Sequence, residues 1–396
     1  MQNGNDSGPP IQNLPEDVLT EILIRLPVKS LLQFRCVCKA WCALIKSPLF
    51  INIHLSRSRM NNKCVMVNRF IKDENKNMIS YHSHDDKESL RVVEVPYLLE
   101  PPRFDLEHAK LLGPCNGIIC LTDFCDIYLC NPATHECKKL PPVPFGCPEE
   151  HDYSTHYVGF GFDQTTNTFK VIRILRWRPD GEYLDYVRRY DVIPPARAEL
   201  YYLNSNSWRE MDAILPWNFY YCPCFALLFK GSFHWHANSE SSDCILSFDM
   251  STEAFREIEY PDEANPDGFG IGLALEPANA RRMSLVSLNN SLALVLYSDP
   301  FGQTLEQVID IWVMMEYGVK ESWIKNFSIR PLFGIRCPIS SWNDDKLLLE
   351  SSSGQLISCP LQDSAQLKEY DIYGDQASIG AVIFEESLVS LSSGTN

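Results

Sequence analysis

Residues 246–261 read LSFDMSTEAFREIEYP: a strand, a polar turn, and a second strand that opens on Phe255 and Arg256. This unit recurs after residue 60, where apolar and polar residues alternate with the period of two that is typical of half-buried strands. The other copies lie at residues 79–96, 127–144, 200–211, 311–329 and 357–374, the first of them being the weakest. A repeated hairpin predicts that most of the chain is built from one kind of β unit.

A second recurring piece precedes most of these hairpins. It is a tight turn followed by alternating apolar residues, as in CNGIICL (115–121), FKGSFHWHA (229–237), LNNSLALVLY (288–297) and WNDDKLLLE (342–350). The pairs Asn-Gly, Lys-Gly, Asn-Asn and Asp-Asp can all reach the positive φ that a two-residue hairpin turn needs. The two pieces together predict four antiparallel strands in each unit.

The spacing of the hairpins indicates a ring. Most successive hairpins lie about 45 to 50 residues apart, close to the ~40 to 50 residues of a four-stranded propeller blade. Longer intervals imply insertions, and residues 176–199, which mix charge, Pro and Gly, predict an exposed loop. We therefore predict a mainly β fold, a Kelch-like β-propeller of about six blades that a strand pair at 380–393 closes beside 64–70. A β-sandwich without a closed ring is the alternative, because the spacing is irregular.

The N-terminal stretch NLPEDVLTEILIRLPVKSLLQFRCVCKAWCALI (13–45) predicts helices instead. Pro15 suits the start of a helix that Pro27 stops, a second helix runs from Lys29, and a third covers Ala43 to about Phe50. We expect a flexible segment at 1–12, a three-helix domain at 13–55 and the β domain at 56–396. Apolar residues on several helix faces indicate either docking of a partner or packing of the helices on the β domain.

The net charge of −16 is unevenly placed along the chain. The first 50 residues hold five basic and four acidic side chains, so the β domain carries all of the negative excess. Such a field repels phosphate backbones and attracts basic partners. The sequence has neither a signal peptide nor an apolar run long enough to span a membrane. We expect no nucleic-acid or membrane binding, no secretion, and a location in the cytosol and possibly also the nucleus.

The cysteines and histidines give little sign of a metal site or cofactor. The chain has 15 cysteines, and none of the spacings forms the paired CxxC of a zinc site, so small buried hydrophobic residues are the better interpretation. His234 and His236 share one face of a strand without an identifiable third ligand, and HSHDD at 82–86 fits a solvated loop. We predict no metal and no cofactor.

Enzyme motifs are also missing. GFGFD (159–163) and GFGIG (268–272) lack the full spacing of a phosphate-binding loop, and no hydrolase elbow, HExxH pair or kinase signature occurs. We predict no catalytic residues. Catalytic groups can converge from distant strands, so a propeller enzyme or a carbohydrate-binding module stays as a less favoured alternative.

The helical stretch resembles an F-box along its whole length. The resemblance lies in the Leu-Pro opening with its acidic pair, the second Leu-Pro, Ser30-Leu31-Leu32, and the ending Arg35-x-Val37-x-Lys39-x-Trp41. It implies binding to a Skp-type adaptor and, through it, to the cullin and RING subunits of an SCF ubiquitin ligase. Carried over by position, the adaptor-binding residues would be Leu14, Pro15, Leu26, Pro27, Leu31, Leu32, Val37 and Trp41.

The rest of the chain resembles the plant F-box-associated domain, and more narrowly the S-locus F-box and S-locus-F-box-like proteins. The similar segments are GPCNGIICLTD, LCNPATHECKKLPPVPFGCP, YVGFGFD, LSFDMSTEAFREI and IDIWVMMEYGVKESWIKNFSIRPL. The resemblance implies a non-catalytic pollen receptor in self-incompatibility, which recruits non-self S-ribonucleases for ubiquitination and proteasomal degradation. Those ribonucleases are typically basic, which agrees with the acidic β domain.

Loops on one propeller face are the predicted target-binding surface, because loops carry variable recognition residues. We expect this surface in 176–199 and 262–269, and the candidate residues are Arg176, Asp180, Glu182, Asp185, Asp262, Glu263 and Asp267. A receptor of the same build for an unrelated protein target is the alternative, since a fold does not fix its ligand.

Overall fold

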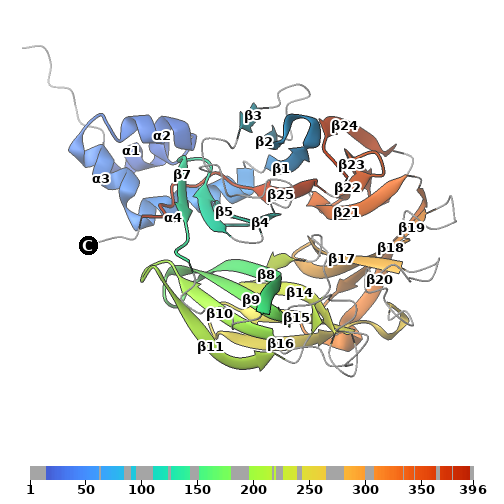
Figure 1. The fold of residues 1–396 in the computed structure, drawn as a ribbon. Helices are drawn as coiled ribbons and strands as arrows, with labels where there is room; N and C mark the ends of the chain where they lie inside the picture. The colour runs from blue at the N-terminus through green and yellow to red at the C-terminus, as the bar shows by residue number, and fades with distance from the viewer. Residues whose placement is uncertain are drawn as a thin grey trace, which may run out of the picture.

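The computed structural model describes residues 15–61, 64–83, 91–94, 110–123, 126–142, 151–179, 196–215, 218–219, 226–238, 243–264, 281–298, 307–332, 334–342, 344–362, 366–376 and 378–392. Four helices are followed by six antiparallel sheets arranged in a ring (Figure 1). The fold is thus a helical region joined to a six-bladed β-propeller. The predicted fold class is confirmed, and the sandwich alternative is excluded.

Each sheet is one blade of the propeller. Blade 1 contains β25 (Gly380–Phe384), β1 (Cys64–Ile71), β2 (Lys76–Ser83) and β3 (Arg91–Glu94). Blade 2 contains β4 (Lys110–Cys115), β5 (Ile118–Thr122), β6 (Ile127–Asn131) and β7 (Glu136–Lys139). Blade 3 contains β8 (His151–Asp163), β9 (Thr168–Pro179), β10 (Ala196–Tyr202) and β11 (Ser207–Leu215).

The remaining blades follow the same order. Blade 4 contains β12 (Asn218–Phe219), β13 (Leu227–Phe229), β14 (Ser232–Asn238), β15 (Asp243–Asp249) and β16 (Ala254–Glu259). Blade 5 contains β17 (Arg281–Leu288), β18 (Ser291–Ser298), β19 (Gln307–Met314) and β20 (Trp323–Leu332). Blade 6 contains β21 (Ile335–Trp342), β22 (Lys346–Ser351), β23 (Gln355–Pro360) and β24 (Lys368–Tyr373). The innermost strands β25, β4, β8, β13, β17 and β21 contact one another around the axis.

The six hairpins predicted from the sequence are the two outer strands of the six blades. The second recurring piece is the turn between the two inner strands, where Asn116, Lys230 and Asn289 have φ of 52°, 48° and 49°. Blade 1 lacks this piece because its two inner strands come from opposite ends of the chain. Local turn chemistry therefore encodes the blade, as the sequence predicted.

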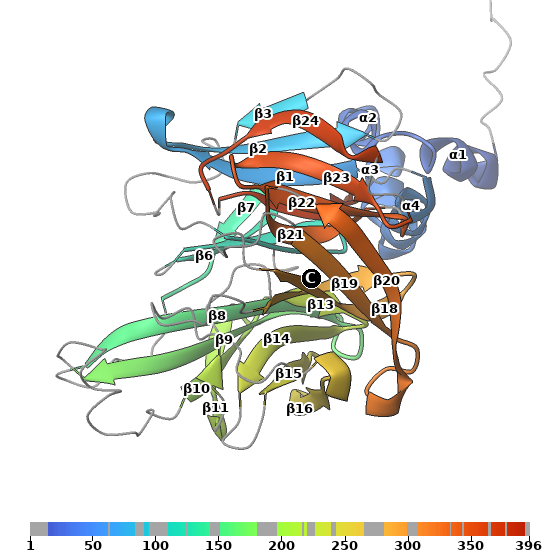
Figure 2. The ribbon, with the colours of Figure 1, turned by 90° about the vertical axis from the view of Figure 1, so that its right-hand side faces the viewer.

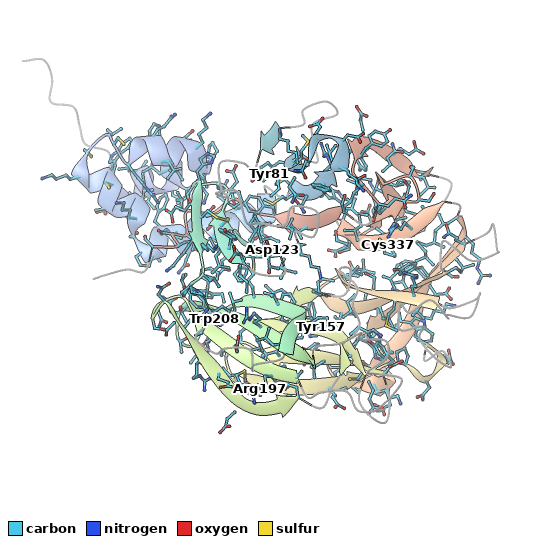
Figure 3. All side chains as sticks on the ribbon, in the orientation of Figure 1. Tyr81, Asp123, Tyr157, Arg197, Trp208 and Cys337 are labelled. Carbon is cyan, nitrogen blue, oxygen red and sulfur yellow. A yellow bond between two sulfur atoms is a disulfide. The ribbon has the colours of Figure 1, made fainter. Side chains whose placement is uncertain are left out.

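The ring closes where β25 pairs with β1, with Met66 opposite Val382. The ring of Tyr81, labelled in Figure 3, packs on Phe384 at a centroid distance of 5.6 Å. The predicted contact between 380–393 and 64–70 is confirmed for this strand. A second strand was also expected in 380–393, and that part is wrong: residues 385–392 leave the sheet and pack against blade 2 and the helices, which satisfy their hydrogen bonds.

The helical region contains α1 (Glu16–Leu23), α2 (Val28–Phe34), α3 (Lys39–Lys46) and α4 (Pro48–Asn61). Pro15 and Pro27 stand at the N-terminal caps of α1 and α2, where a missing N–H costs nothing. One helix was expected from Ala43 to about Phe50, but Pro48 divides that stretch, ends α3 and opens the longer α4. In the described part of the chain, no helix is long and apolar enough to cross a membrane.

Some of the described cysteines are small buried residues, as predicted, whereas Cys36 and Cys38 in the helical region are exposed. Cys120, Cys244, Cys359 and Cys337 (labelled in Figure 3) are buried thiols. Two others depart from this interpretation, because Cys130 and Cys137 form a disulfide. They are direct cross-strand partners on β6 and β7, a pairing that follows from the hairpin register and not from the spacing of the cysteines along the chain.

Candidate functional site

The helical unit, residues 15–61, contributes most of a small apolar core. Leu23, Val28, Leu31, Ile45 and Phe50 are almost fully buried, with exposed fractions of 1% or less. Trp41 packs its ring edge-on against Phe34 at 5.4 Å, and its backbone N–H donates to Cys38 Sγ at the start of α3. These contacts hold α1, α2 and α3 in a fixed arrangement.

Large apolar side chains remain outside this core. Val18 and Ile22 are 44% and 46% exposed and lie one turn apart on α1, so they share a face of that helix. Val37, in the turn between α2 and α3, is 61% exposed. Leu49 and Ile53 of α4 are also exposed, but we reserve the name apolar surface of the helical unit for Val18, Ile22 and Val37. Exposed apolar side chains of this size in a small unit mark a protein-interaction site.

The structure separates the predicted adaptor-binding residues into three groups. Pro15, Pro27 and Val37 are exposed, and Leu26, Leu32 and Trp41 are half-buried. Leu31 has no exposed surface, so it supports the helical core and cannot touch a partner directly. Leu14 lies outside the described residues.

Sequence reasoning missed Val18 and Ile22 as surface residues. Both belong to the apolar run Val18, Leu19, Ile22, Leu23, which was assigned to a single helix stripe. Val18 and Ile22 are four residues apart, as are Leu19 and Leu23. This spacing indicates two adjacent apolar stripes on the helix. Only Leu23 of this run is buried.

The helices lie on one side of the propeller, and the ends of the strands that lead into the longest connections lie on the other. Since neighbouring strands in each blade are antiparallel, the turns between strands one and two and between three and four share one side. The helical unit packs on that side, because Ala133 of the β6–β7 turn joins its core. Figure 2 shows the helices on one side and the end of β9 pointing to the other. We call this other side the distal face.

The predicted target-binding residues are only partly described. Asp262 and Glu263 are exposed in a short 3-10 helix after β16, at the seam between blades 4 and 5. Lys320 of blade 5 pairs with Asp262 at 2.7 Å and with Glu259 at 3.0 Å. Arg176 belongs to the end of β9, and its side chain lies outside the described residues, as do Asp180, Glu182, Asp185 and Asp267. Only Asp262 and Glu263 of the seven have described side chains, so the target-binding surface stays a prediction.

The histidines of FHWHA are core residues. His234 Nδ1 donates to Leu227 O at 3.2 Å, and its Nε2 lies 2.7 Å from Tyr317 Oη. His236 Nδ1 contacts Tyr260 Oη. Burial lowers the pKa of each imidazole to about 4. Among the described residues, no group of three His, Cys, Asp or Glu side chains could hold a metal. The two rings fill the sheet as neutral hydrogen-bonding groups.

Because these histidines are buried, we expect acid to lower the stability of the propeller. The pKa of His236 is lower in the folded chain than in the unfolded chain, so the unfolded state binds protons first as the pH falls. Stability is therefore lost between about pH 6.5 and pH 4, and by pH 5 the loss is about 2 kcal/mol for each buried histidine. Urea unfolding at pH 7 and pH 5 measures it. His236→Asn, which keeps a polar group beside Tyr260, should reduce the pH-dependent loss by about 2 kcal/mol, and an unchanged loss would contradict the assignment.

The same architecture is found in a known family. The F-box domain profile matches residues 11–52, and the F-box associated beta propeller domain profile matches residues 63–390, which is most of the chain. The chain is an F-box protein. Its helical unit is the F-box, and its six blades form the F-box-associated propeller.

Relatives of this F-box protein are found over nearly its full length. F-box protein CPR1 of Arabidopsis thaliana is 25% identical over 399 residues, which cover 95% of this chain and 88% of that protein. The F-box/kelch-repeat protein At3g23880 of the same plant is 28% identical over 354 residues, or 86% of each chain. Among solved structures, oligogalacturonate lyase from Vibrio parahaemolyticus aligns with a TM-score of 0.41 and 10% identity, over 77% of this chain and 78% of that one. A likeness this weak carries no argument about function.

Proposed function

We propose that this F-box protein is a non-catalytic substrate receptor of an SCF-type ubiquitin ligase. An F-box implies binding to a Skp-type adaptor, and the observation that carries the proposal is the apolar surface of the helical unit. Val18, Ile22 and Val37 stand exposed on a rigid support, which is the arrangement that a protein partner can bury. Cullin and RING subunits would join through the adaptor. We also propose that the protein works in the cytosol or nucleus, where most of its cysteines would remain thiols.

For the target we propose a basic protein held at the distal face. Six connections that join strand ends at this face hold fourteen acidic and only three basic residues between them. These connections are residues 95–109, 143–150, 180–195, 239–242, 265–280 and 299–306. The negative charge in the sequence of these connections would attract a basic partner, while the helical unit on the other side stays free for the adaptor. A non-self S-ribonuclease, degraded in pollen after ubiquitination, is the specific target that we propose.

A binding experiment with a charge control tests this target. The full chain should capture basic S-ribonucleases at low salt and lose them as salt rises, because the attraction is largely screened. Neutralising Asp180, Glu182 and Asp185 together should weaken capture by roughly tenfold at low salt. The matched control neutralises Glu16, Asp17 and Glu21, which changes the net charge equally on the opposite side.

The outcomes test the proposed binding face, the proposed target and the proposed receptor function separately. Equal weakening by both triple variants would show that net charge alone acts, and would contradict a binding face. Capture of the adaptor without any ribonuclease would leave the receptor function in place and redirect the search to an unrelated target. Failure to capture the adaptor would overturn the receptor function itself.

A further inference from the structure

The C-terminal segment joins the two parts of the molecule a second time. The chain passes from helix to propeller where α4 ends at Asn61 and β1 begins at Cys64. A single short link sets the position of a small unit but leaves its orientation free. After β25, residues 385–392 run back from the closed ring to the helices (Figure 1). We call this segment the clasp.

Blade 2 holds the clasp through the side chains of Asn131, which is buried, and Glu136, which is half-buried. Asn131 has no exposed surface, and its Nδ2 donates to Ser387 O at 2.9 Å and to Val389 O at 2.7 Å. One carboxylate oxygen of Glu136 accepts from Leu391 N and from the Ser390 hydroxyl, both at 2.8 Å. Four polar groups of an irregular segment are thus satisfied by two side chains of one hairpin, which fixes its path.

Gly117 explains how closely the clasp approaches blade 2. This residue has φ of 75°, and a Cβ added to it would stand 2.2 Å from Ser387 Cβ. The tight turn of blade 2 therefore leaves a space that the clasp fills. The clasp is fitted to this turn as well as hydrogen-bonded to the neighbouring hairpin.

The other side of the clasp belongs to the helical unit. Leu388 is 1% exposed and completes the core that contains Val28 and Leu31. Glu386 accepts from Val28 N at 3.4 Å. Arg59 of α4 donates to Glu385 at 3.3 Å and to Asn116 of blade 2 at 2.7 Å. The helical core is incomplete without a residue that follows the last propeller strand.

We propose that the clasp fixes the orientation of the helical unit on the propeller, and that Asn131 and Leu388 are positioning residues for ubiquitin transfer. The inference rests on the proposed receptor function. A target on the distal face is modified only when its lysines reach the ubiquitin-carrying enzyme, whose place is set by the adaptor on the helices. The clasp adds to the direct contacts that Ala133 and Asn116 of blade 2 make with the helices, and together they hold the two surfaces at one separation and angle. Without the clasp, a wider range of angles would be accessible.

A distance measurement on the full chain tests the clasp. Fluorophores are attached through bio-orthogonal amino acids at the exposed positions Lys39 in α3 and Glu74 in the β1–β2 turn. Asn131→Asp keeps the oxygen that accepts from Ala133 N and Thr134 N, but replaces the donor to the clasp by an oxygen. We expect a narrow distance distribution in the intact chain and one at least about twofold broader in this variant.

Two further variants make the result specific. Leu388→Ala loosens the clasp from the helical side and should broaden the distribution in the same way, whereas Glu369→Ala, an exposed carboxylate on β24, should leave it unchanged. Adaptor affinity should stay within about twofold in the clasp variants, because Val18, Ile22 and Val37 are untouched. A distribution that stays narrow in both clasp variants overturns the inference. If the intact chain fails to bind the adaptor, the proposed function is wrong, but the distances still decide the role of the clasp.

Discussion

Replacing Ile22 and Val37 by Asp together should abolish adaptor binding while both parts of the molecule stay folded. The two side chains are 46% and 61% exposed, so the change should cost the fold little, within about 1 kcal/mol. In a complex each would be buried, and a carboxylate there would have no partner. We expect the adaptor affinity to fall by roughly 100-fold or more, since central apolar residues of an interface each contribute about 2 kcal/mol or more.

Calorimetric titration of adaptor into the full chain, with thermal melts of each variant, measures this effect. Met315→Asp is the matched control, because Met315 is 64% exposed but lies on blade 5, away from the helical unit. An adaptor affinity that stays within threefold in the double variant would contradict the assignment of this surface. Leu31→Asp is not a useful test, because Leu31 is fully buried and the variant would unfold the helical unit.

Leu31 is buried and Val37 is exposed, and the sequence did not predict this difference within the helical unit. Resemblance identified the right segment, and periodicity identified its helices. Neither could divide the apolar residues between core and surface, because part of the core is supplied by Leu388 from the far end of the chain. That contact depends on tertiary packing and leaves no local signal.

In the propeller, the local sequence predicted more of the structure than it did in the helical unit. Each blade repeats its own turns, so six hairpins, their strand order and the closing strand β25 were available from spacing and turn residues alone. The path of residues 385–392 could not be predicted, because these residues bond to side chains and not to a sheet edge. The predicted target-binding surface rests on the order of the strands. That order shows at which face two strands are connected, but it does not show how the side chains of the connection are arranged.

Contacts between blades are also not predicted by the repeated hairpins. We expect one of these contacts, made by Lys170, to contribute strongly to the stability of the protein. Lys170 of β9 is 1% exposed, and its Nζ lies 2.7 Å from Asp163 and 2.7 Å from Glu253 of blade 4. It also donates to Met250 O at 2.8 Å. Burial by itself would raise the pKa of Asp163, but hydrogen bonds from Lys170, Thr166 and Ser251 outweigh it and hold the pKa well below its usual range.

Lys170→Met should therefore destabilise the protein by about 3 to 5 kcal/mol, because it leaves the Asp163 carboxylate buried without its cation. Thermal melting should show a fall of roughly 5 °C. The deficit should shrink toward acid pH, since without Lys170 the pKa of Asp163 rises and the carboxyl can take up a proton. Arg197→Met in the same blade removes the cation of an exposed pair with Glu210 and should cost under about 1 kcal/mol.

The double variant Lys170→Met with Asp163→Asn decides whether charge or packing causes the loss. If the uncompensated carboxylate is responsible, the second change removes it and should restore at least about half of the lost stability, because an amide can still accept from Thr165 N and Ser251 Oγ. Glu253 keeps its contacts with Tyr202 and Arg209 in both variants. A double variant no more stable than Lys170→Met would show that the lysine acts through packing of its stem at the seam between blades 3 and 4.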